Sequence, residues 1–334
     1  TAGEPWSATT RTPLGTPPHL YASWARKVWV VGVAANAPFA GGVRWADDSP
    51  LRFVNLESKP TFFRISPFFG AATGPVRFAL GPHVDVGSLE VRQATDHVVE
   101  EGSAHLLLRG TGIGADLSVF VTLESMRLGL SYKSRTALGL TGEADFEVPG
   151  PFQHQLPDQV VTARWTLPDR LALGQAFAVG GASVFVDETL TLWSVNDALA
   201  IDFTDPATPD VNQVNAWQDA LALRLGVERP VGESSVVRGG GYLDGLGLNG
   251  RGAAIVPTDT LGPSSPDGLR VGATVGAGAR LSDHTRGDAF LEGLVILRRA
   301  ATGAEVPAAS YGGWAAIAGF TVGFAGDPPP PSGG

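Results

Sequence analysis

The chain has no cysteine, a single methionine, and charged residues at only 17% of its 334 positions. Without cysteine, disulfides and thiolate metal sites are excluded. The net charge is −9 and no stretch is rich in Lys or Arg, which argues against a nucleic-acid partner. No motif for a metal, a cofactor or a catalytic triad stands out from the residue spacing. We therefore expect no enzymatic activity, no metal and no cofactor.

The sequence also has no long apolar run suited to a helix. The longest uncharged stretch, Val306 to Gly326, contains five glycines and a proline, a poor composition for a membrane helix. Its apolar and small residues alternate with a period of two, which indicates a strand. With 44 Gly and 25 Pro in the chain, strands joined by turns are the expected structure.

The same alternation recurs along the chain, for example in 126–135, 220–228 and 269–281. A soluble sandwich also alternates, but three features favour a membrane barrel. Short turns alternate with longer polar loops, the last strand ends in Phe324, and the tryptophans lie toward expected strand ends. An interfacial girdle would place them there. They are Trp24, Trp29, Trp45, Trp165, Trp193, Trp217 and Trp314. We predict an all-β, transmembrane antiparallel β-barrel with about 13 strands between Pro18 and Phe324.

One predicted strand, Val28 to Trp45, contains residues that weaken strand pairing. Proline cannot donate to a ladder and glycine contributes no side chain, so a local break is expected. The break predicts either a lateral opening in the wall or a structural bulge at a barrel corner. The candidate opening consists of Asn36, Ala37, Pro38, Phe39, Gly41 and Gly42.

Positive charge is expected inside the barrel. Arg127, Lys133 and Arg135 share one face of the alternating pattern with Thr141, so they are candidates to hold a carboxylate in the lumen. Arg238 is a further candidate. The alternative is that these cations pair with Glu or Asp of neighbouring strands, as is common inside barrels.

Clustered phenylalanines suggest an apolar surface. Phe62 and Phe63 are adjacent, so they cannot face the same way, and at least one is expected to point inward and contact a ligand. The alternative is that both face lipid.

Several segments in order resemble the FadL family of outer-membrane transporters for fatty acids and aromatic hydrocarbons. The resemblance runs from about Pro18 to Phe324. The chain has Ala40 where the family usually has glycine. The matching segments are Gly32–Phe39, Arg127–Ser134, Asp158–Gln159 leading to Leu167–Pro168, Trp217–Asp219 before Leu225–Glu228, Arg238–Tyr242, and the closing strand.

The resemblance implies a barrel of 14 strands plugged by an N-terminal hatch, with lateral exit of substrate near a kinked third strand. Residues 1–17 would then be an extracellular loop remnant after a missing hatch and first strand. Residues 18–324 would be the barrel, and residues 325–334 a disordered Pro-rich tail. The implied location is the bacterial outer membrane, with membrane lipid and lipopolysaccharide as surroundings.

The expected function is passive uptake of long-chain fatty acids or aromatic hydrocarbons. The alternative is a structural scaffold or receptor with protein partners in an outer-membrane complex.

Overall fold

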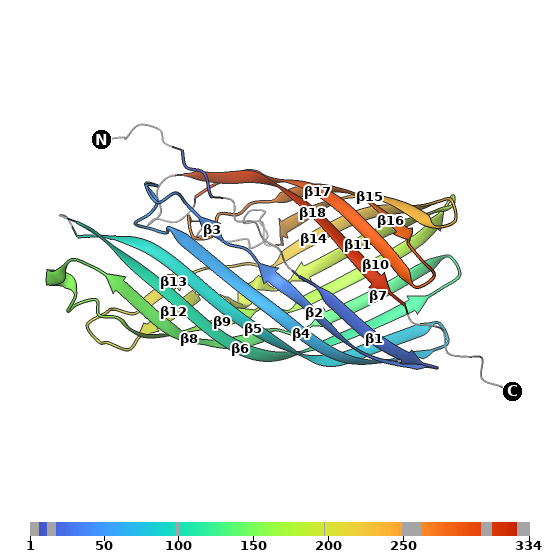
Figure 1. Ribbon diagram of the computed structural model, residues 1–334, viewed down its shortest axis with the longest axis horizontal. Helices are drawn as coiled ribbons and strands as arrows, with labels where there is room; N and C mark the ends of the chain where they lie inside the picture. The colour runs from blue at the N-terminus through green and yellow to red at the C-terminus, as the bar shows by residue number, and fades with distance from the viewer. Residues whose placement is uncertain are drawn as a thin grey trace.

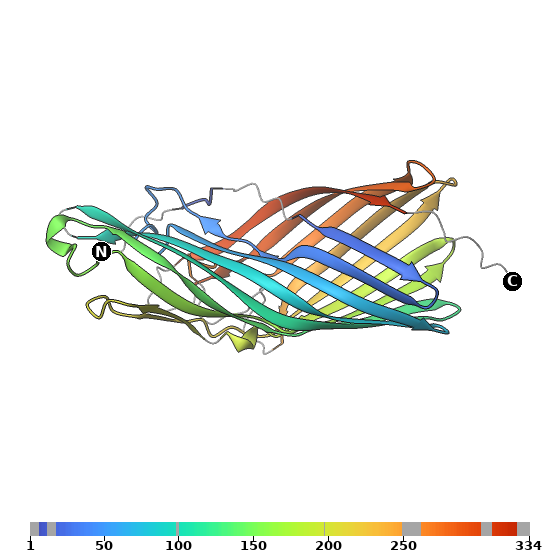
Figure 2. The ribbon, with the colours of Figure 1, turned by 60° about the horizontal axis from the view of Figure 1, so that its bottom comes forward.

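The computed structural model describes residues 7–11, 18–97, 100–196, 198–248, 262–301 and 309–325. These residues form an all-β structure whose single sheet is rolled into a barrel (Figure 1, Figure 2). Two single-turn 3-10 helices interrupt it, η1 (Gly150–Phe152) and η2 (Trp193–Val195). Within the described residues, no helix has the length and apolar character needed to cross a membrane.

The sheet contains 18 strand segments, all paired antiparallel where a register is defined. They are β1 (Leu20–Arg26), β2 (Trp29–Ala40), β3 (Val43–Arg44), β4 (Glu57–Thr73), β5 (Val76–Asp96), β6 (Glu101–Thr122), β7 (Met126–Lys133), β8 (Thr136–Glu147), β9 (Gln159–Leu167), β10 (Arg170–Val179), β11 (Ala182–Thr191), β12 (Ala198–Phe203), β13 (Val211–Val214), β14 (Ala220–Val231), β15 (Ser235–Gly247), β16 (Arg270–Arg280), β17 (Thr285–Ala300) and β18 (Ser310–Phe324).

Five pairs of consecutive segments are each one barrel strand with a short break. For example, β6 pairs with both β7 and β8, and these pair in turn with β10 and β9. The other interrupted barrel strands are β2/β3, β11/β12 and β13/β14. The 18 segments thus make thirteen barrel strands, in agreement with the number predicted from the sequence.

The first and last barrel strands have free edges. In the described part of the chain, β1 pairs only with β2 and β18 only with β17. Both are exposed along almost their whole length; Trp314 on β18 retains 79% of its accessible surface. Because neighbours alternate in direction, the first and thirteenth strands run the same way. One side-chain contact joins them, from His19 Nε2 to Thr321 Oγ1 at 3.2 Å.

The barrel has two structurally different halves. At one end, β8, β9 and β12 with the adjoining parts of β4, β5 and β6 enclose an apolar core, which we call the packed half. At the other end the described inward side chains are mostly small or polar, and we call this end the open half; it contains β7, β10, β11 and β14 to β17. The core of the packed half consists of Phe62, Leu89, Leu106, Leu108, Leu138, Leu140, Ala144, Phe146, Val161, Ala163, Leu167, Leu199 and Ile201.

The break between β7 and β8 changes the phase of the alternation. In β7, Lys133 faces inward, opposite Asp116 of β6. In β8 the buried, inward residues are Thr136 and Leu138, three and five positions later. The break contains one residue more than a continuous alternation would have. The β8 positions that would continue the face of Lys133 therefore point outward. The break between β9 and β10 does the same, since inward Leu167 is followed by inward Arg170.

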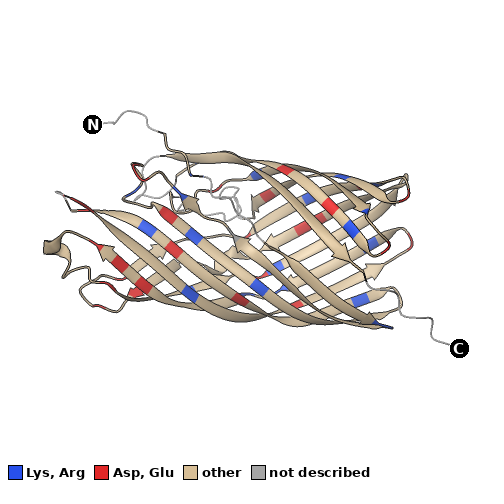
Figure 3. Ribbon diagram, viewed as in Figure 1, with Lys and Arg blue, Asp and Glu red and all other residues tan. Residues whose placement is uncertain are grey.

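The outward faces also differ between the halves. In the open half, β5 and β6 expose Phe78, Leu80, Val84 and Val86, and Ile113 and Leu117. In the packed half their outward residues are mostly polar, including Ser88, Glu90, Arg109 and His105. Figure 3 shows that the charged positions on the near strands lie mostly toward the packed half. The outward residues of β5 from Phe78 to Val86 are apolar. This stretch is about as long as a tilted strand that crosses the hydrocarbon layer of a membrane.

Candidate functional site

The wall is interrupted at β2, where the sequence predicted a break. Pairing with β1 ends at Leu20 opposite Ala35. Pairing with β4 shifts between Asn36, which faces Arg64, and Phe39, which faces Phe62. Three steps along β2 thus match two along β4, which is a β-bulge that accommodates Ala37 and Pro38. From Asn36 to Ala40, β2 is therefore held on the β4 side only in the described structure.

The two glycines after the bulge have different environments. A Cβ at Gly41 would have no atom within 4 Å, so this position borders open space. Gly42 has a φ of +156°, and a Cβ there would lie 2.8 Å from the carbonyl oxygen of Ser58. A glycine is required at position 42, whereas position 41 can accept a side chain.

Five aromatic rings run across the lumen directly behind the bulge. We call them the aromatic chain: Phe62 to Trp165 (5.8 Å between ring centroids), Trp165 to Trp217 (5.7 Å), Trp217 to Trp193 (5.5 Å) and Trp193 to Phe39 (5.0 Å). β4 and β9 are not neighbours in the sheet, so the first of these contacts spans the barrel. The aromatic chain separates the lumen of the open half from the core of the packed half. Its last ring is that of the bulge residue Phe39.

Breaks in the barrel strands position these rings. Trp193 lies on η2, where the barrel strand β11/β12 is interrupted, and Trp217 lies between β13 and β14. Asn196 holds η2 in place, because its amide accepts a hydrogen bond from the backbone N–H of Thr166 and donates one to its carbonyl (3.2 and 2.7 Å). Asp219 accepts a hydrogen bond from the Ser194 N–H (3.1 Å).

Two buried polar atoms at the aromatic chain have no partner in the structure. They are Nε1 of Trp165, a donor, and Oε1 of Gln218, an acceptor beside Trp217. A buried polar group without a hydrogen bond is costly, so a water or a ligand polar group at this place would stabilise the site.

An ionic cluster that is buried except for Asp116, which is 21% exposed, lies beside the bulge. Arg64 donates two hydrogen bonds of 2.8 Å to Asp85, and the two side chains are 2% and 0% exposed. His83 lies 2.9 Å from Asp116 through Nδ1 and 2.8 Å from the Thr136 hydroxyl through Nε2. This cluster ties β4, β5, β6 and β8 together, because each member would be left uncompensated if its partner were removed.

Two cations next to this cluster have no acidic partner. Lys133 and Arg170 are directly opposite each other on β7 and β10. Neither forms an ion pair within 4.0 Å in the described part of the chain, although Asp116 acts on Lys133 from a longer distance. The guanidinium of Arg170 lies 5.6 Å from the centre of the Phe39 ring. In the described part of the chain, two cations that have no direct ion-pair partner, but that feel Asp116 and Asp244 at longer range, thus meet the aromatic chain at the bulge. Both would attract an anionic group.

The other predicted cations are placed differently. Arg135 does not share a face with Lys133, and that prediction is wrong: it follows the phase change, faces outward and bonds Asp169 (2.8 Å), as does the lipid-side Tyr132. Thr141 is displaced to the outward face for the same reason. Arg127 lies on the inward face of β7, near the end of the open half. Arg238 is inward but already paired with Glu228 and Asp288.

The phenylalanine prediction divides between the two residues. Phe62 is 2% exposed and inward, whereas Phe63 lies on the opposite face of β4. Trp45, Trp165, Trp193 and Trp217 lie at or near the ends of strand segments, as predicted, but they do not form an interfacial girdle. Trp45 is buried, and the other three belong to the aromatic chain. The alternation of the sequence does not show that the strand breaks place these rings inside the barrel.

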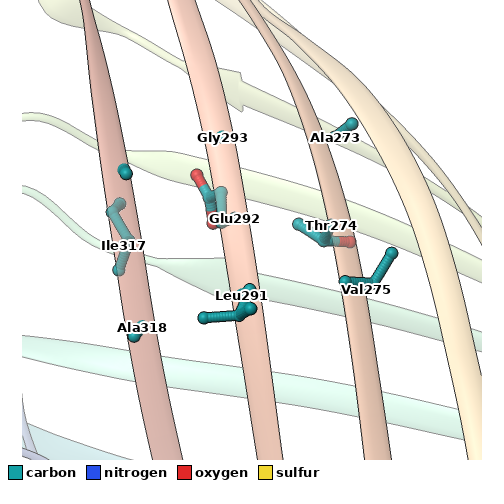
Figure 4. A pocket seen from close by; sticks show the side chains of 9 residues that line it. Ala273, Thr274, Val275, Leu291, Glu292, Gly293, Ile317 and Ala318 are labelled. Carbon is teal, nitrogen blue, oxygen red and sulfur yellow. The ribbon is translucent and has the colours of Figure 1, made fainter.

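Grooves lie along the described strands of the open half. One, of about 650 Å³, follows the lumen wall of β14 to β17 and is lined by paired polar side chains such as Arg224, Arg238 and Tyr242. Another, of about 410 Å³, lies on β16 to β18 (Figure 4). Its lining includes exposed outward Val275 and Leu291 together with inward Glu292, so it is a surface hollow near the free edge of β18.

No protein-family model matches the sequence, and no curated protein is similar to it. Solved structures are similar in fold. A Pseudomonas aeruginosa FadL homologue superposes with a TM-score of 0.73 over 91% of this chain and 75% of its own, at 15% identity. The P. putida toluene transporter TodX superposes with a TM-score of 0.68 over 95% and 84%, at 16% identity. The Ralstonia pickettii toluene transporter TbuX gives 0.68 over 92% and 80%, at 15% identity.

The chain has the fold of the FadL-type channels. The fold resemblance inferred from short sequence segments is thereby confirmed over more than nine-tenths of the chain. TodX and TbuX are toluene transporters.

Proposed function

We propose that the protein is a passive channel of the bacterial outer membrane for hydrophobic small molecules, which leave sideways through the wall at Asn36–Gly42. The observation that carries this proposal is the aromatic chain, which ends on Phe39 where β2 loses its partner on one side. A hydrophobic molecule held by these rings would lie beside the stretch of wall that is paired on one side only. Such a break is costly in lipid unless it serves as an opening.

The cation pair extends the proposal to the end group of the ligand. Lys133 and Arg170 would hold the carboxylate of a long-chain fatty acid, with its apolar chain against Phe39 and Trp193. An aromatic hydrocarbon would use the rings alone. The carboxylate adds charge-assisted hydrogen bonds that a hydrocarbon lacks, so a fatty acid is the better fit to both features.

The free edges of β1 and β18 are positioned to pair with one further strand between them. Both edges run in the same direction, so one additional strand between them would be antiparallel to both and would make the barrel even-numbered. The same edges are what a scaffold or receptor would offer to a partner chain, and they are the observation that keeps this second function open.

A steric test separates transport from folding. Gly41→Trp should fill the open space at the bulge and lower uptake of a labelled long-chain fatty acid by cells roughly tenfold, since passage requires that space. Gly293→Trp is the matched control, because a Cβ there also has no neighbour within 4 Å but points outward from β17, away from the bulge. Heat-modifiable migration on gels would show that both variants fold.

Unchanged uptake of fatty acids and of toluene by a well-folded Gly41→Trp protein would exclude lateral transport and favour the scaffold function. If Gly293→Trp reduced uptake equally, the effect would be a general one on the barrel and the opening would lose its support.

A further inference from the structure

The outward face of the barrel changes from apolar to polar along one register row. In that row Thr61 faces Ser88, Ser88 faces Arg109, Arg109 faces Thr141, and Thr141 faces Thr162. The next rows toward the open half carry Phe63 with Val86, then Ile65 with Val84 and Ile113, the last 75% exposed. On β4 and β5 the exposed apolar surface ends at this row, which indicates the edge of the hydrocarbon layer there.

Two exposed arginines lie at this boundary, on barrel strands that are separated by one other strand. Arg109 of β6 is in the boundary row, and Arg164 of β9 is in the row with Phe63 and Val86, opposite Gly139 of β8. The two positions are separated by one barrel strand and offset by two residues, about 12 Å between Cα atoms from standard sheet spacings. Two arginine side chains can converge over that distance on one multivalent anion.

These arginines are not used by the protein itself. In the part of the chain that the structure describes, neither forms a hydrogen bond or an ion pair through its guanidinium. The outward carboxylates of Glu143 and Asp202 lie at least one row or one strand away and make no ion pair with them. Further out, Glu90 is already bound by Arg92 and His105. Arg135, at the membrane side, is bound by Asp169.

We propose that Arg109 and Arg164 form a binding site for the phosphate groups of an outer-leaflet lipid. The site lies where headgroup phosphates meet the hydrocarbon edge, and guanidinium groups bind phosphate by paired, charge-assisted hydrogen bonds. The small outward residues between them, Gly139 and Thr141, leave room for a headgroup against the wall. This inference rests on the proposed outer-membrane location, and it assigns to this face a lipid ligand separate from the cargo in the lumen.

The test uses the full chain purified in a non-ionic detergent and diphosphorylated lipid A as the probe, with binding followed by native mass spectrometry. The double variant R109Q/R164Q should bind the probe roughly tenfold more weakly, because two charge-assisted contacts are lost. R109K/R164K should retain part of the affinity. Enzymatically dephosphorylated lipid A should bind wild type and R109Q/R164Q equally weakly.

The matched control is R26Q/R229Q, which removes the same charge from exposed positions at the other end of the barrel. Equal loss of binding in both double variants, or equal binding of phosphorylated and dephosphorylated lipid A, would overturn the site. Displacement of the lipid by inorganic phosphate would make the pair a general anion site and would also overturn the proposal. Failure of the wild-type protein to fold into lipid vesicles would instead refute the outer-membrane location.

Discussion

The packed half and the open half are built from the same strands with opposite polarity. On β6, Leu106 and Leu108 point inward into a dry core while Arg109 points outward. A few residues along the same strand, Asp116 points inward and Leu117, 49% exposed, points outward. The packed half is thus organised like a water-soluble protein and the open half like a membrane barrel.

One strand can therefore border two different environments if apolar and polar residues exchange between its inward and outward faces along its length. β6 does this by a change of residue type at constant phase. The neighbouring β7/β8 and β9/β10 do it by a break that shifts the phase. The breaks coincide with the ionic cluster and the aromatic chain, so the candidate site lies at the junction where the two environments meet.

The junction should be the most sensitive region to loss of a charge. Asp85→Asn leaves Arg64 buried without its counter-ion and should destabilise folding into lipid vesicles by about 3–5 kcal/mol. Asp244→Asn, which breaks the half-exposed 3.3 Å pair with Arg224 in the open lumen, should cost about 0–1 kcal/mol. Urea titrations monitored by tryptophan fluorescence would compare the two. Similar losses of stability for both variants would mean that Asp85 at the junction is no better shielded from water than Asp244 in the lumen.

The next largest difference should come from the barrel interior. Leu108 is 0% exposed within the packed core, so Leu108→Ala should cost roughly 2–5 kcal/mol through lost burial and a cavity. Thr274 lies on the wall of the open lumen, and Thr274→Ala should change stability by about 0.5 kcal/mol or less. The same urea titration measures both. A neutral Leu108→Ala would contradict a close-packed core at that end.

The outward faces provide the smallest but most direct test of where the membrane ends. Leu117 is central in the apolar band of β6, so Leu117→Arg should cost roughly 2–4 kcal/mol in a bilayer. Leu107 is outward on the same strand beyond the boundary row, and Leu107→Arg should cost about 0–1 kcal/mol. Equal penalties would place the hydrocarbon edge farther out than Arg109 and separate that residue from the headgroups.

Much of the fold could be predicted from residue order. Alternation with a period of two, the glycine and proline content and the alternating loop lengths predicted an antiparallel barrel of about 13 strands. Pro38, Gly41 and Gly42 predicted interrupted pairing on β2, because proline lacks a donor and glycine contributes no side chain to the packing of a strand. These are local properties, carried by each residue and its immediate neighbours.

The candidate site was predicted less well. Lys133 was placed in the lumen correctly, but Arg135 was not, since the pattern gives no sign of the extra residue between β7 and β8. Arg170 and the tryptophans of the aromatic chain were not recognised as one group. They come from β2, β4, β9 and β10 and from the breaks in β11/β12 and β13/β14. Only the rolling of the sheet into a barrel brings them together.

The sequence by itself determined the strands, their approximate number and the weak point at the β2 bulge, because backbone chemistry acts over a few residues. Only the tertiary structure decided which face of each strand is inside, since a shift of one residue exchanges the two faces of a strand. It also decided which cations are neutralised. Arg64 and Arg238 are paired whereas Lys133, Arg170, Arg109 and Arg164 are not, because a partner across the sheet is set by the register between strands.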